Sequence, residues 1–90
     1  MNELISEMAQ IKLTAIETRL KEIEDTIIPL VEAGIELKAV IDQTSPEMEG
    51  SFLHAMLNQR YNRIREEVEA LKEETTNLAA EVLKILTDLL

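Results

Sequence analysis

Side chains able to do chemistry are few in this 90-residue chain, and they form no catalytic pattern. Cysteine is absent, which excludes a disulfide, a thiol nucleophile and a thiolate metal site. His54 is the only histidine, and no Glu-x-x-His or His-Glu-x-x-His spacing surrounds it, so the usual di-iron and zinc helix motifs are missing. His54 could act as a pH switch, but its apolar neighbours favour a structural histidine.

Catalytic loops are missing as well. The sequence has no Gly-rich phosphate loop, no Gly-x-Ser-x-Gly elbow and no serine close to a histidine that would activate it. Carboxylates are abundant, but none stands in an isolated apolar stretch that would raise its pKa for acid catalysis. We therefore expect a protein that is not an enzyme and that uses no cofactor and no metal.

One basic cluster interrupts the acidic sequence, with Arg60, Arg63 and Arg65 around Tyr61. The arginines could contact an anion or a phosphate while Tyr61 stacks beside them. The favoured interpretation instead pairs Arg63 and Arg65 with the glutamates four residues later on the same helix. A third interpretation docks the arginines against the carboxylates of a partner subunit.

Net charge separates the remaining classes of partner. The chain holds 18 acidic and 9 basic residues, for a net charge of -9, which disfavours nucleic acid and anionic membranes as direct partners. The glutamates from Glu66 to Glu74 are most simply a solvated helix face. Their alternative role is mimicry of a phosphate backbone, which would make the protein an acidic inhibitor that blocks a basic surface of another macromolecule.

The spacing of apolar residues predicts the elements that carry these side chains. Two series advance in alternating steps of four and three, the period of helices that pack along one seam. They predict one all-α domain over residues 1–90, with helices at 2–42 and 47–89. The first series is Ala9, Leu13, Ile16, Leu20, Ile23, Ile27, Leu30, Gly34, Leu37 and Ile41, and the second is Leu57, Tyr61, Ile64, Val68, Leu71, Thr75, Leu78, Val82, Ile85 and Leu89.

A polar turn at 43–46 separates the two series. Thr44 or Ser45 can cap the second helix, and Pro46 suits its first turn. Gly50-Ser51 offers a second start for that helix.

Matched helix lengths and a short link predict an antiparallel hairpin. A tight turn would set Ile27 opposite Ile64 and Gly34 opposite Leu57. Pro29 is expected to kink the first helix, because it removes a backbone hydrogen bond. The alternative ends that helix near Ile28 and gives three helices.

More apolar residues lie outside the seam than a lone hairpin can cover. A dimeric four-helix bundle would bury them, because a twofold axis lets one surface complement itself. Another helical protein could cover them equally well. The predicted partner-binding residues are Ile28, Val31, Ile35, Phe52, Leu53, Met56, Leu83 and Leu86.

The outline of two helices of similar length around a central turn resembles the small helical hairpins of type VII secretion. Their Trp-x-Gly turn motif is absent, and this chain has Gly50-Ser51-Phe52 instead. The resemblance implies the hairpin architecture and no site residues. Residues 1–10 lack the basic start of a signal peptide, and a cysteine-free chain suits a reducing compartment, so we expect a cytoplasmic protein without a membrane anchor.

Overall fold

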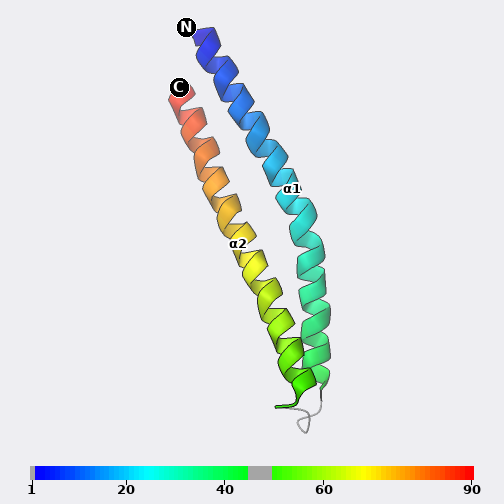
Figure 1. Ribbon diagram of the computed structural model, residues 1–90. Helices are drawn as coiled ribbons and strands as arrows, with labels where there is room; N and C mark the ends of the chain where they lie inside the picture. The colour runs from blue at the N-terminus through cyan, green and yellow to red at the C-terminus, as the bar shows by residue number, and fades with distance from the viewer. Residues whose placement is uncertain (1, 45–49) are drawn as a thin grey trace.

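Two antiparallel helices make up the computed structural model, which describes residues 2–44 and 50–90. Helix α1 spans Asn2–Gln43 and α2 spans Phe52–Leu89, and the two pack side by side as a hairpin (Figure 1). The described residues contain no strand. The predicted all-α hairpin is therefore confirmed.

The ends of the two helices at the turn are closed by separate side chains. The Thr44 hydroxyl donates to the Ile41 carbonyl at 2.6 Å, so Thr44 closes α1 and does not cap α2. The Ser51 side chain caps α2 by accepting from the His54 backbone N–H at 3.1 Å. Gly50 has a φ of +82°, which a helix cannot contain, and α2 accordingly starts at Phe52. Of the two expected starts, the one at Gly50-Ser51 is found, and Ser45 and Pro46 lie outside the described residues.

The predicted seam is the buried part of the molecule. Every residue of both series is buried or half-buried, apart from Leu89 at the end of α2. Full burial is nonetheless rare among the described residues, and α2 has no buried residue at all. The buried apolar side chains are Ala9, Ile16, Ile23 and Ile41.

The pairing of the helices differs from the expected one by a heptad. A Cβ atom placed on Gly34 would lie 3.4 Å from Ile64 Cγ2, so Gly34 faces Ile64 instead of Leu57. The cause is the turn, because α2 starts at Phe52 and a longer link slides it along α1. A slip of seven residues keeps apolar residues opposite apolar residues, which is why the seam survives the change.

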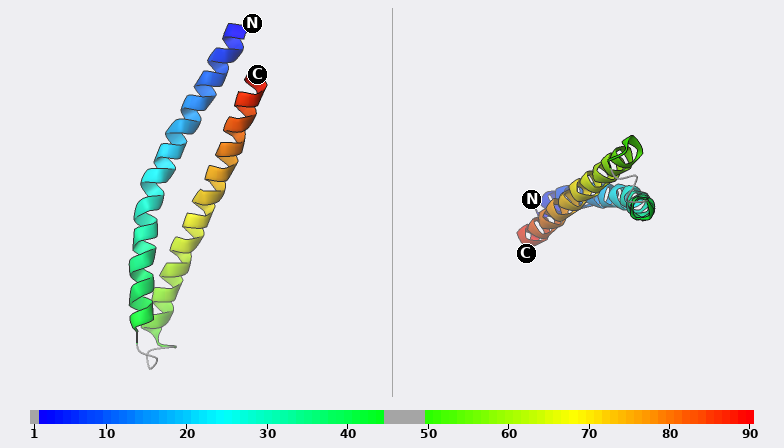
Figure 2. Two further views of the ribbon diagram at one scale, coloured as in Figure 1. Left: turned by 180° about the vertical axis from the view of Figure 1, so that it is seen from behind. Right: turned by 90° about the horizontal axis from the view of Figure 1, so that it is seen from below.

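Pro29 lies inside α1, which continues through it as one helix. The three-helix alternative is therefore wrong. Figure 2 shows a gentle bow in α1 beside a straighter α2. A local kink at Pro29 stays a prediction.

The hairpin is a thin rod of 70 × 17 × 15 Å, with both chain ends at the end away from the turn (Figure 1). Its radius of gyration is 20.1 Å, whereas a compact domain of this length has one of about 12 Å. Its accessible surface is 7148 Å², and a compact monomer of the same mass exposes about 5,300 Å². The excess surface is therefore about 1,800 Å² per chain.

Candidate functional site

The described apolar surface includes every residue that the sequence assigned to partner binding. All eight are exposed, from 37% for Met56 to 84% for Phe52. They do not share one side of the rod. The structure divides most of them between two sides, which we call the groove side and the bridge side.

The groove side is marked by an apolar groove between the helices. Its floor includes Leu30 and Gly34 of α1 and Ile64 and Val68 of α2. Gly34 opens this groove, because it has no side chain to fill the space beside Ile64. The rim holds Val31, Ile35, Lys38, Arg65, Glu69 and Lys72.

Charged side chains on this rim are mostly basic. The Lys38 amine lies 3.0 Å from an Asp42 carboxylate oxygen and 6.0 Å from the centre of the Tyr61 ring. The Lys72 amine lies 3.6 Å from Glu69. With Arg65, the rim carries three cations and one acid, an unusual balance in a chain with a net charge of -9.

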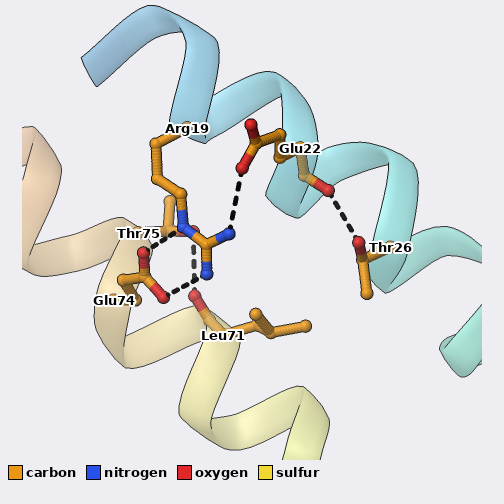
Figure 3. A network of polar contacts seen from close by, with 6 residues as sticks. All are labelled: Arg19, Glu22, Thr26, Leu71, Glu74 and Thr75. Atoms are coloured by element: carbon orange, nitrogen blue, oxygen red, sulfur yellow. Dashed lines mark hydrogen bonds and ion pairs between the residues drawn. The ribbon is translucent and has the colours of Figure 1, made fainter. Parts of the chain in front are cut away.

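The bridge side is marked by an ion pair between the helices (Figure 3). Arg19 Nε and Nη2 donate to the two carboxylate oxygens of Glu74, the Nη2 bond at 2.8 Å, and Arg19 Nη1 donates to Glu22 at 3.2 Å. The bonds to Arg19 hold the pKa of the Glu74 carboxyl below its usual range. The same bonds, those to Glu74 foremost, raise the pKa of the Arg19 guanidinium. This geometry clamps α1 to α2 and offers no proton donor for chemistry near neutral pH.

At the turn end, the bridge side carries a second apolar patch. Val40 lies three heptads after Arg19, and Leu53 lies three heptads before Glu74, so both belong to this side. Met56 follows Leu53 by three residues and joins them on the same face. Leu53 and Met56 therefore lie on the other side of the rod from Val31 and Ile35.

At the end of the rod away from the turn, exposed leucines of α2 lie on the groove side. Leu86 lies three heptads after Arg65, and Leu83 lies two heptads after Glu69. Both are exposed, Leu83 by 66% and Leu86 by 46%. The groove side thus carries one apolar stripe on each helix.

The three arginines are divided between the two sides of the rod. Arg65 lies on the groove rim, whereas Arg60 and Arg63 follow Leu53 and Met56 by one heptad and so lie on the bridge side. Within residues 2–44 and 50–90, no ion pair joins any of the three to a carboxylate. The expected pairs with the glutamates four residues later are therefore not formed.

His54 has a structural partner. The Asn58 side-chain amide lies 3.2 Å from His54 Nδ1 and also donates to the His54 carbonyl at 3.0 Å. This arrangement agrees with a structural histidine. Thr75, the polar residue of the second series, donates to the Leu71 carbonyl at 2.9 Å (Figure 3), as a threonine bonding back to the preceding turn should.

Sequence reasoning missed two features of these surfaces. Val40 is 48% exposed although it precedes the buried Ile41. The Arg19–Glu74 bridge was also missed, since finding it requires the correct register. The sequence did contain a signal for this bridge, because Arg19 and Glu74 have opposite charges and flank the apolar seams of two antiparallel helices, where such pairs form.

No group of three or more histidine, aspartate or glutamate side chains could hold a metal ion within the described residues. No described helix combines the length and the apolar character needed to cross a membrane. Comparison of the chain with known protein families, curated proteins and solved structures found no match.

Proposed function

We propose that this chain is a non-enzymatic assembly module, in which two hairpins associate through their exposed apolar residues as a dimeric four-helix bundle of coiled-coil type. The observation that carries the proposal is the near-absence of a core. Four apolar side chains are buried in the described part of the chain, against thirteen large apolar side chains that are exposed. Burying one such side chain is worth about 1.5–3 kcal/mol, so leaving them in water is costly.

The amount of uncovered surface fits a permanent dimer. The excess of about 1,800 Å² per chain corresponds to an interface of about 3,600 Å² in total. Obligate homodimers bury roughly 2,000–5,000 Å². A second copy is the simplest partner, because a closed twofold contact needs no other gene product. A different helical protein remains the alternative partner, and the cysteine-free chain fits a reducing compartment such as the cytoplasm.

The acidic run gives less support to the competing role as a phosphate mimic. Glu74 is held by Arg19 and Glu69 by Lys72. Part of the negative charge is thus neutralised within the hairpin. A mimic would need that charge to face its target.

Sedimentation equilibrium across the micromolar range tests the proposal directly. We expect a mass of two chains, and Ile35→Glu should shift it toward one chain, because Ile35 is 65% exposed and its charge would be trapped in the interface. Ala39→Glu is the matched control, since it adds the same charge to an exposed residue of α1 outside the groove rim. A wild-type monomer that is fully helical at these concentrations would overturn the proposal.

A further inference from the structure

The groove side carries two apolar stripes of equal pattern. The first lies on α1 and consists of Ile28, Val31 and Ile35 (the α1 stripe). The second consists of Leu83 and Leu86 of α2 together with Leu90, the C-cap residue that follows the helix (the α2 stripe). Both follow the spacing i, i+3, i+7 of one helix face. We propose that the α1 stripe of each copy packs against the α2 stripe of its partner in a twofold antiparallel dimer. This inference rests on the proposed self-association and names the surfaces that make it.

Positions along the rod favour this pairing. Val31 lies 12 residues before Gln43, about 18 Å from the turn end at 1.5 Å per residue. The position of the α2 stripe follows from Ile85, the neighbour of Leu86, which lines a hollow with Lys12 of α1. Lys12 is 10 residues from the start of α1 at Asn2, so the α2 stripe lies about 15 Å from the end of the rod away from the turn. The two stripes are thus almost equally far from opposite ends. An antiparallel twofold through the middle of the rods brings each stripe onto the other and centres the contact on the middle of both rods.

Pairing each stripe with its own copy works less well. An antiparallel twofold centred on the α1 stripe would overlap only about 36 Å of the 70 Å rods, twice the distance from that stripe to the turn end. It would also leave both α2 stripes in water. The proposed pairing covers all four stripes with one axis, and the rods cross at an angle because the stripes lie on different helices.

The distribution of charged residues also favours pairing of the α1 stripe with the α2 stripe. The α1 stripe lies beside three cations, Lys38, Arg65 and Lys72, and two acids, Glu69 and Asp42, of which Asp42 lies 3.0 Å from the Lys38 amine. The α1 residues beside the α2 stripe lie whole heptads before Val31 and Ile35, on the same face of α1. They are acidic or neutral: Glu7, Gln10, Thr14 and Glu17. Self-pairing of either stripe would therefore oppose like charges, whereas the proposed pairing brings a basic rim to an acidic one.

The absence of cysteine allows a direct test by disulfide trapping. Val31→Cys and Leu86→Cys are made as separate chains, one of them isotopically labelled, and mixed under mild oxidation. We expect the mixed Val31→Cys with Leu86→Cys dimer to be the main product in mass spectrometry, since a disulfide forms only between Cα atoms about 4.4–6.8 Å apart. Ala39→Cys is the control and should be trapped with neither.

A charge-exchange experiment gives an independent answer. Val31→Lys and Leu86→Glu should each weaken self-association at least tenfold, because each homodimer would contain two damaged contacts. An equimolar mixture should recover most of the affinity, since the mixed dimer keeps one native contact and gains a Lys–Glu pair at the other. Ala39→Glu, outside both stripes, should leave association within twofold of the wild type.

The outcomes separate this inference from the proposed function. Self-trapped Val31→Cys or Leu86→Cys pairs as the main products, or a mixture no tighter than its components, would overturn the stripe pairing while the chain still dimerises. Wild-type chains that sediment as monomers would overturn both.

Discussion

Arg19 and Glu74 form the most specific contact between the two helices. Both side chains are exposed to water, at 43% and 38% of their surface, and exposed ion pairs add little to stability because water screens them. Their use is geometric. The two-pronged contact fixes which heptad of α2 faces α1, where apolar residues alone tolerate a slip of seven residues.

The first prediction concerns the pH dependence of this bridge. Arg19 lowers the pKa of Glu74 below its ordinary value of 4.5, so the bridge stabilises the fold above that value and its contribution is lost as the pH falls through the lowered pKa. Glu74→Gln should therefore lower the urea midpoint slightly at pH 7, and the difference from the wild type should vanish in strong acid. Glu73→Gln, one residue away and in no described ion pair, should show no such convergence.

Gly34 gives a second prediction at this scale. Alanine favours a helix by about 1 kcal/mol over glycine, and the added Cβ would lie in van der Waals range of Ile64 Cγ2, at 3.4 Å. Gly34→Ala should therefore raise the free energy of unfolding by about 0.5–1 kcal/mol. Gly34→Leu should lower it, because a large side chain would push α2 away at this point. Chemical denaturation followed by circular dichroism distinguishes the two, and equal effects of both variants would contradict the close approach.

At the scale of the helices, Ser51 defines where α2 begins. Its side chain accepts the His54 N–H, and loss of such a cap costs about 1 kcal/mol. Ser51→Ala should lower the free energy of unfolding by that amount, while Ser51→Asp, which keeps an acceptor, should retain most of it. Denaturant titration measures both variants. An alanine variant as stable as the wild type would show that the cap is dispensable.

Pro29 tests the integrity of α1. A proline inside a helix removes a hydrogen bond and crowds the preceding turn, at about 3 kcal/mol. We expect Pro29→Ala to increase the helical signal and the thermal midpoint. If it lowers the midpoint instead, the bow seen in Figure 2 is needed for packing, and the proline is a functional feature of the element.

The sequence was informative about the elements and less so about how they meet. Heptad spacing identified both helices, although α2 starts at Phe52 and not at residue 47. It also identified the seam residues except for Leu89, because each series follows one helix face. It could not fix the register, since a slip of one heptad leaves the same residue types in contact. The sequence alone also could not show that the exposed apolar residues divide between two sides of the rod. Leu53 and Val31 can be assigned to a side only once the pairing of α1 and α2 is known.

For the whole molecule, we expect folding and dimerisation to be coupled. A rod with four buried apolar side chains in its described part has little to hold it folded alone. The thermal midpoint should therefore rise with protein concentration, as it does when folding and dimerisation are linked. Differential scanning calorimetry over a hundredfold range of concentration measures this. A constant midpoint would mean that the hairpin folds without its partner.

The placement of both chain ends at one tip of the rod has a practical consequence (Figure 1). If two rods lie head to tail, their tips are separated by almost the full 70 Å length, too far for efficient energy transfer between fluorescent dyes attached there. Cargo fused to either terminus would likewise be held apart by the pair, as by a spacer, whereas rods lying head to head would bring it together.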